Sequence, residues 1–175
     1  MSSYRTVGDG LMMVFIGEIL SIFTFLPLLG GILAIASVIV QLVGLYKAGS
    51  EEEGYRLAFG LSVLLIFLAI AELVLPFVGL IRAIVGMVVL YCVCITTADL
   101  LDHCDYETAQ WGRNVWKICL GCTITAVICA LLAFVPLVNI LAYLTMIIAM
   151  VVSVIGVILY LIFLYRASNS LREAG

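Results

Sequence analysis

Apolar residues fill six long runs of the chain, separated by short polar or proline-containing segments. The runs cover residues 11–26, 28–46, 57–75, 77–98, 114–135 and 137–165. A helix needs about 20 apolar residues to cross a bilayer core of roughly 30 Å, and such a helix satisfies its own backbone hydrogen bonds. The pattern therefore predicts an all-α integral membrane protein, with six transmembrane helices in a single transmembrane domain over residues 1–175.

The six runs form three pairs, and a proline lies between the two runs of each pair. Each proline is followed three residues later by glycine or asparagine. These positions are Pro27 with Gly30, Pro76 with Gly79, and Pro136 with Asn139. Proline ends an incoming helix, and glycine or asparagine tolerates unusual backbone angles in the turn. The repetition predicts three Pro-turn helical hairpins with a pseudo-threefold relation, over approximately 11–47, 57–98 and 114–165. Hairpins that all point the same way differ from the inverted repeats of many secondary transporters.

Composition and charge set the class of protein and its orientation. The chain is 66% hydrophobic and 11% charged, with a net charge of -3, which excludes a soluble domain and disfavours a nucleic-acid partner. Of the Lys and Arg residues, only Arg82 falls on the side of the proline turns. The other seven are Arg5, Lys47, Arg56, Arg113, Lys117, Arg166 and Arg172. This asymmetry predicts a multi-pass protein of the cell membrane with both termini in the cytoplasm.

Tyrosines and tryptophans cluster near the predicted cytoplasmic ends of the runs. Their positions are Tyr46, Tyr55, Tyr106, Trp111, Trp116 and Tyr165. Amphipathic rings favour the interface between lipid and water, so this cluster predicts an aromatic belt on the cytoplasmic side.

Three ionisable residues, Glu18, Glu72 and Arg82, interrupt the apolar runs. A charge inside a membrane costs on the order of 3 kcal/mol, which makes each a candidate functional residue. Glu72 precedes Pro76 by four residues and Arg82 follows it by six, so both lie roughly 6 to 9 Å from the same turn. We expect a structural ion pair across the hairpin; gating or binding of a substrate carboxylate is the alternative.

Glu18 lies deeper, nine residues before Pro27, or about 13 Å down the first run. No basic residue is adjacent to it in sequence. A neutral hydrogen-bonded acid, an ion pair with Arg82 of another hairpin, and a proton or cation site all fit this position.

Small residues recur at steps of three and four along several runs, which favours close packing of helices in lipid. The stripe of the second run contains Gly30, Ala34, Ser37, Gln41, Gly44 and Ala48. The stripes also contain polar side chains, and Gln41, Asn139 and Ser153 are the candidates for a polar path through the bundle. We expect these residues to serve packing.

Six cysteines occupy the second half of the chain. Cys92, Cys94, Cys119 and Cys122 are expected at one depth, which makes them weak candidates for a metal or thiol site. Cysteine also serves as a small apolar residue, and we expect that role here, with no bound metal and no cofactor.

No nucleotide-binding loop, nucleophile elbow or metalloprotease motif is present, so we expect no enzymatic activity. The organisation into three hairpins resembles that of small bacterial membrane proteins such as the HdeD-type acid-stress family. This resemblance implies no site residues. The pattern favours a membrane component that associates with itself or with another membrane protein in the lipid bilayer. A small channel or proton-coupled transporter using Glu18 is the first alternative, and a membrane thiol or metal-binding protein is the second.

Overall fold

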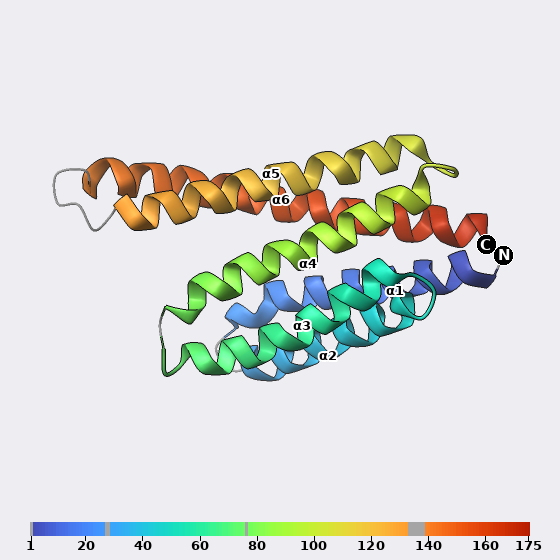
Figure 1. Ribbon diagram of the computed structural model, residues 1–175, viewed down its shortest axis with the longest axis horizontal. Coiled ribbons are helices and arrows are strands. Elements are labelled where there is room, and N and C mark those ends of the chain that lie inside the picture. Colours follow the sequence, from blue (N-terminus) through green and yellow to red (C-terminus); the bar gives the residue numbers. More distant parts are fainter. Residues whose placement is uncertain (1, 27–28, 76, 133–138) are drawn as a thin grey trace.

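The computed structural model describes residues 2–26, 29–75, 77–132 and 139–175, and in these it contains six α-helices, one short 3-10 helix and no strands. The helices are α1 (Ser2–Ile22), α2 (Gly30–Gly49), α3 (Glu53–Glu72), α4 (Val78–Leu101), α5 (Tyr106–Leu132) and α6 (Asn139–Ala174), and the 3-10 helix η1 (Phe23–Phe25) follows α1 (Figure 1). The prediction of an all-α fold is confirmed.

Four segments of the described chain are long and apolar enough to cross a membrane: α2, α3, α4 and the part of α6 from Ile147 to Ala174. The other two helices start with polar residues. Arg5 and Asp9 lie in the first half of α1, and Arg113 and Lys117 lie in the first half of α5.

Three helices extend well beyond the apolar runs that predicted them. Helix α1 begins at Ser2 and α5 at Tyr106, ahead of runs that start at 11 and 114, and α6 continues to Ala174. These extensions mix polar residues with apolar residues that are fully buried, such as Ala109 and Leu171. A count of consecutive apolar residues does not detect such amphipathic turns, which is why the predicted boundaries were too short.

The six helices form a closed ring. Each helix packs against its neighbours in sequence, and α6 returns to pack against α1. Both chain termini and the connections α2–α3 and α4–α5 lie at one end, which we name the terminal end (Figure 1). The connections within the pairs α1–α2, α3–α4 and α5–α6 lie at the opposite end, which we name the turn end.

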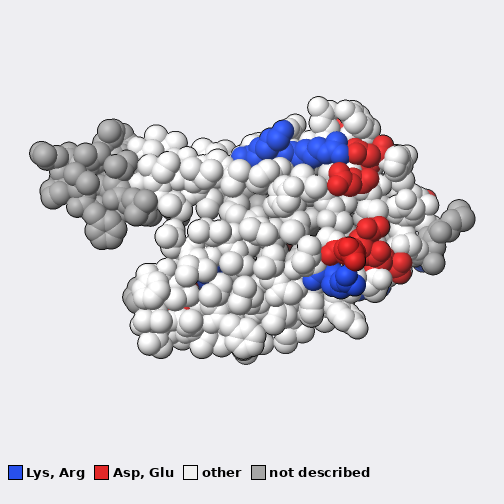
Figure 2. Space-filling model, in the orientation of Figure 1, with Lys and Arg blue, Asp and Glu red and all other residues white. Residues whose placement is uncertain are grey.

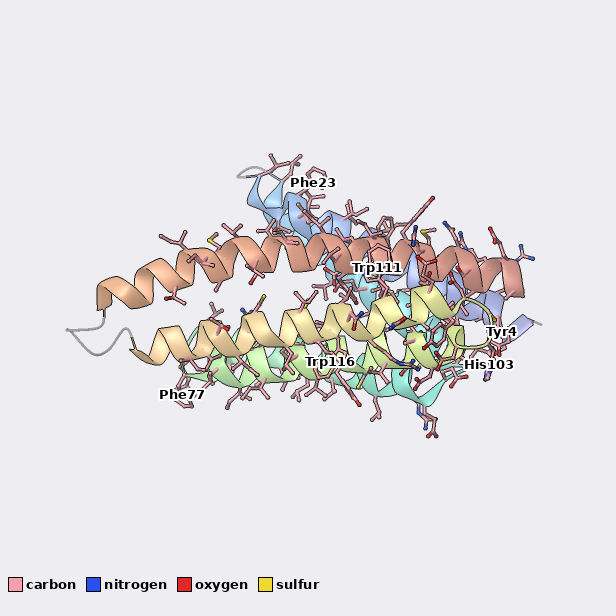
Figure 3. The ribbon with its side chains drawn as sticks, turned by 90° about the horizontal axis from the view of Figure 1, so that it is seen from above. Tyr4, Phe23, Phe77, His103, Trp111 and Trp116 are labelled. Carbon is pink, nitrogen blue, oxygen red and sulfur yellow. The ribbon has the colours of Figure 1, made fainter. Side chains whose placement is uncertain are left out.

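The hydrophobic core is concentrated at the terminal end. Its largest fully buried side chains include Leu11, Tyr55, Leu101, Phe163 and Leu171, which come from α1, α3, α4 and α6. Towards the turn end the helix pairs separate: Phe23, after α1, and Phe77, before α4, lie far apart in the view from above (Figure 3). The α5–α6 pair also extends past the others in this direction (Figure 1). The ring is therefore packed at its terminal end, and its helix pairs diverge towards its turn end.

The glycines of the turns have a different role from the one expected. No described residue, glycine included, has a positive φ angle, so unusual backbone angles do not explain Gly30 or Gly79. A Cβ at Gly30 would collide with the carbonyl oxygen of Thr24, and one at Gly79 would lie 2.6 Å from Oε1 of Glu72. Both glycines provide room for a close approach. Pro27, Pro76, and the third turn with Pro136 lie outside the described residues.

The small residues of α2 pack tightly on α1, as their spacing predicted. A Cβ at Gly44 would lie 2.6 Å from the Gly10 carbonyl oxygen, so these two backbones are almost in contact. Further along, a Cβ at Gly17 would lie 2.5 Å from Cγ of Gln41. The α1–α2 pair therefore depends on backbone approach, the mode of association expected for helices in lipid.

The residues of the predicted aromatic belt differ in their exposure. Tyr46, Tyr106 and Tyr165 are exposed near the terminal end. Tyr55 is instead fully buried, with its hydroxyl 2.6 Å from Oγ1 of Thr97. Trp116 packs edge to face on Tyr91, with ring centroids 4.9 Å apart. Tyr55 therefore belongs to the core, because a partner on α4 satisfies its hydroxyl there.

Candidate functional site

A cavity of about 900 Å³ lies inside the helix ring and receives lining residues from all six helices. Most of the lining is aliphatic, including Ile35, Val38, Leu65 and Ile66. Each helix also contributes one polar or polarisable residue: Glu18 from α1, Gln41 from α2, Ser62 from α3, Arg82 from α4, Cys119 from α5 and Tyr160 from α6. An apolar pocket with a few convergent polar groups is the usual form of a small-molecule site.

Glu18 is the acidic residue of the cavity wall and is half-buried. The Ser21 hydroxyl, one turn further along α1, donates a hydrogen bond of 2.7 Å to the Glu18 backbone carbonyl. Among the described residues, no Lys or Arg side chain lies within ion-pair distance of the Glu18 carboxylate. The expected alternative of a Glu18–Arg82 ion pair is therefore wrong.

Arg82 pairs with Glu72 instead. Its Nε lies 3.0 Å from Oε2 of Glu72, and the side chains are 48% and 34% exposed, respectively. This contact confirms the ion pair expected across the α3–α4 turn. Gly79 lies beneath the Glu72 carboxylate, so the small residue of the turn makes room for the acid. Arg82 thus faces the cavity with its charge already compensated.

Two of the three residues proposed for a polar path, Gln41 and Ser153, lie in different environments. Gln41 lines the cavity, with its aliphatic Cγ packed against Gly17. Ser153 does not line it, and its hydroxyl donates a 2.8 Å hydrogen bond to the Ala149 carbonyl of its own helix. The side chain of Asn139 lies outside the described residues. Of the two candidates whose side chains the structure describes, Gln41 lines the cavity and Ser153 does not.

The cysteines occupy different environments. Cys94 is buried in the core, Cys119 lines the cavity, and Cys92 and Cys122 are half-buried. All five cysteines that the structure describes are free thiols. Within the described ranges, no three His, Cys, Asp or Glu side chains are arranged to bind a metal ion. Cys92, Cys94, Cys119 and Cys122, which were expected at one depth in the membrane, therefore do not form a common set of metal ligands.

Below the cavity, towards the terminal end, the ring is filled by side chains. The Thr97 hydroxyl donates a 2.6 Å hydrogen bond to the Val93 carbonyl, so the Tyr55 hydroxyl must be the donor in its own contact with Thr97. Phe163 packs directly on Gly112, where a Cβ would lie 2.5 Å from the phenyl ring. These buried contacts join α3 to α4 and α5 to α6. The cavity therefore has a closed floor at the terminal end.

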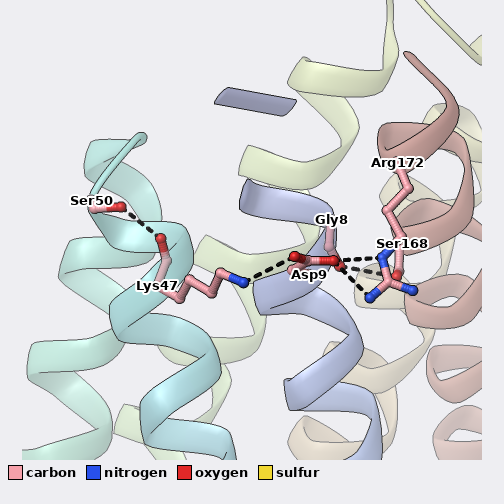
Figure 4. A network of polar contacts seen from close by, with 6 residues as sticks. All are labelled: Gly8, Asp9, Lys47, Ser50, Ser168 and Arg172. Atoms are coloured by element: carbon pink, nitrogen blue, oxygen red, sulfur yellow. Dashed lines mark hydrogen bonds and ion pairs between the residues drawn. The ribbon is translucent and has the colours of Figure 1, made fainter. Parts of the chain in front are cut away.

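A network centred on Asp9 fastens three helices beside this floor (Figure 4). Lys47 of α2 donates a hydrogen bond of 2.9 Å to Asp9, and Arg172 of α6 donates one of 2.8 Å. The hydrogen bond from Lys47, together with that from Arg172, holds the pKa of the Asp9 carboxyl below its ordinary value. The Ser168 hydroxyl adds a 3.0 Å hydrogen bond to the Gly8 carbonyl. The apolar pattern places Lys47 and Arg172 at the same end but carries no sign of Asp9 as their shared partner.

A second set of contacts fastens α5. Arg113 binds the carboxylates of Asp99 and Asp102 on and after α4. Asp105 accepts hydrogen bonds from the Thr108 hydroxyl and backbone N–H, which caps α5, and from the Ser170 hydroxyl of α6. The bonds from Thr108 hold the pKa of Asp105 below its ordinary value. The terminal end is thus crossed by polar contacts between neighbouring helices.

The surface of the molecule also differs between the terminal end and the turn end. Charged residues gather near the terminal end, and the surface towards the turn end is almost uniformly uncharged (Figure 2). Comparison of the chain with protein-family models, with curated proteins and with solved structures finds no match.

Proposed function

We propose that this chain is a six-span integral membrane protein whose central cavity binds a small solute. Four segments already meet the length and apolarity that a span requires. Helices α1 and α5 complete the set, because both lie in the same closed ring and each continues into an apolar stretch after its polar start. Three successive helix pairs with matching proline turns support an origin by repetition of a hairpin.

The proposed orientation places the terminal end in the cytoplasm and the turn end outside, in the cell membrane. Seven of the eight Lys and Arg residues belong to the terminal end, where short cytoplasmic loops of membrane proteins carry such residues. The remaining one, Arg82, is paired with Glu72.

The observation that carries the proposal is the cavity: it is lined by all six helices and contains Glu18, and its floor is closed by the core at the terminal end. A scaffold that served only association would gain nothing from an ionisable residue in a cavity wall, where the cost of charge is high. The closed floor disfavours a permanently open channel. An arrangement open on one side fits a solute-binding or carrier protein.

Accessibility of the cavity wall to water tests this function. In a cysteine-free background, Ser62→Cys places a thiol in the cavity wall, and Leu64→Cys places one on the exposed, non-lining face of α3. We expect an impermeant thiol reagent, applied outside intact cells, to modify the Ser62 position at least about tenfold faster, since thiols react as solvated thiolates. Equal rates at the two positions would exclude a hydrated cavity.

Association with another membrane protein remains a second candidate function, favoured by one observation. On α6, Ile147, Met150, Val151 and Val154 are all more than half exposed. Lipid or a partner helix can cover such a face. Crosslinking of Met150→Cys in native membranes, with Leu57→Cys on α3 as the matched exposed control, distinguishes a self-association at α6 from simple contact with lipid.

A further inference from the structure

The cavity wall contains one uncompensated charge. Of its two ionisable side chains of opposite sign, Arg82 is held by Glu72 at 3.0 Å, and Glu18 has no cationic partner among the described residues. Gln41 and Ser62, the polar lining residues of α2 and α3, are neutral. When Glu18 is ionised, the cavity therefore carries a net negative charge that a bound solute can neutralise.

The rest of the wall restricts what that solute can be. Aliphatic side chains such as Val38, Leu65 and Val89 provide most of the surface, and few polar groups are present to replace lost hydration. A compact, strongly hydrated cation would enter at a high desolvation cost. A cation whose charge is shielded by apolar groups loses less hydration and also gains from burial of its apolar surface.

The size of the cavity and an aromatic residue in its wall also fit a cation with an apolar body. A cavity of about 900 Å³ is within the range of sites for drug-sized molecules. The Tyr160 side chain lines the same cavity and is buried at its floor, so an aromatic ring is available near Glu18 for contact with a cation. An anion would meet the Glu18 carboxylate without a free cation to offset it.

We propose that the cavity binds an organic cation with an apolar body, and that Glu18 provides the counter-charge. The inference rests on the proposed solute-binding function and specifies its substrate class. Glu18 is the residue that contacts the positive charge, and the aliphatic lining of α2, α3 and α4 holds the apolar body.

Two probes of nearly equal shape and opposite charge test the inference: tetraphenylphosphonium and tetraphenylborate. Binding of each is measured by equilibrium dialysis with the full chain in nanodiscs of zwitterionic lipid, and empty nanodiscs correct for partition into lipid. We expect saturable binding of the phosphonium and none of the borate. Glu18→Gln should weaken phosphonium binding by about tenfold or more, because it removes the charge and keeps the shape.

Glu18→Asp keeps the charge and should retain most of the binding. Glu53→Gln, which changes an acid that is 87% exposed at the terminal end, should leave binding unchanged. Equal binding of both probes, equal binding by wild type and Glu18→Gln, or no saturable phosphonium binding by the folded wild-type protein would each overturn the inference. Thermal unfolding of every variant confirms folding. Labelling at Ser62→Cys reports separately on the proposed function. If that position is labelled but binding does not depend on the charge of the probe, the substrate class is refuted and the proposed solute-binding cavity is not.

Discussion

The Arg82 guanidinium lies 3.0 Å from the Glu72 carboxylate, across the turn that joins α3 to α4. Arg82 follows Glu72 by ten positions, and the turn returns α4 beside α3 so that both side chains reach the same depth. The pair cancels two of the three charges that lie far from the terminal end. Glu18 is the third. Because Arg82 is already paired with Glu72, Glu18 has no cationic partner among the described residues.

The Glu72–Arg82 pair should stabilise the α3–α4 turn. Glu72→Gln and Arg82→Met are each expected to lower the unfolding temperature in detergent, and the double variant should lose less than the sum of the two. Because both side chains are a third to a half exposed, we expect a coupling free energy of about 1 kcal/mol, well below that of a buried pair. Additive effects in this double-mutant cycle would show that the contact contributes nothing.

Close packing of α1 on α2 should make Gly44 intolerant of a side chain. A Cβ there would lie 2.6 Å from the Gly10 carbonyl oxygen and 2.9 Å from the Val14 nitrogen, and neither backbone atom can rotate away. Gly44→Ala should cost about 2 kcal/mol of unfolding free energy, as for other overpacked sites. Gly60→Ala is the matched control, because its Cβ would meet open space. The control should be neutral or slightly stabilising, and equal losses at both glycines would refute the close approach.

Asp9 should make stability depend on pH in the acidic range. Its pKa is depressed in the folded state by Lys47 and Arg172, so its ion pairs contribute fully above the unfolded pKa of about 3.9. This contribution is lost as the pH falls through that value towards the lower folded pKa. Asp9→Asn should therefore destabilise by on the order of 1 kcal/mol at pH 7, with the difference from wild type shrinking below about pH 4.

Thermal unfolding in detergent between pH 3 and 7 measures the effect of Asp9. Glu53→Gln is the control, since its partner Arg56 is 70% exposed and the pair should add little. A deficit of Asp9→Asn that stays constant down to pH 3 would mean that the carboxylate does not act through its charge.

The proposed orientation predicts which end of the bundle faces outwards. A cysteine at Gly31 has open space around it at the turn end, and one at Glu53 replaces an exposed side chain at the terminal end. In a cysteine-free background, an impermeant reagent outside intact cells should label the Gly31 position and miss the Glu53 position. Labelling of the Glu53 position alone would place the termini outside.

Sequence patterns predicted much of the fold because its elements are local. Runs of apolar residues locate the helices, and the proline and glycine spacing locates the turn at Pro76 closely enough to pair Glu72 with Arg82. The helix extensions, such as α5 from Tyr106, were missed because their buried residues alternate with polar ones. Burial of Tyr55 was missed because its partner, Thr97, comes from another helix.

The cavity lies beyond what linear patterns can predict. Ser62 lines it only because the ring turns that face of α3 inwards, and a single serine in an apolar run carries no signal of this. Glu18 was identified from its depth alone. Whether it would pair with Arg82 depended on how three helix pairs are arranged, and this arrangement depends on contacts between distant residues such as Ser168 and Gly8.

The reactivity of two native thiols tests the central claim, a cavity open on one side and closed on the other, most directly. Cys119 lines the cavity and Cys94 is fully buried in the core below it. In chains that retain only one of these cysteines, an impermeant thiol reagent outside right-side-out vesicles should modify Cys119. It should leave Cys94 unmodified from either side until the protein is unfolded. Modification of Cys119 only from the cytoplasmic side, or of Cys94 as fast as Cys119, would contradict this account.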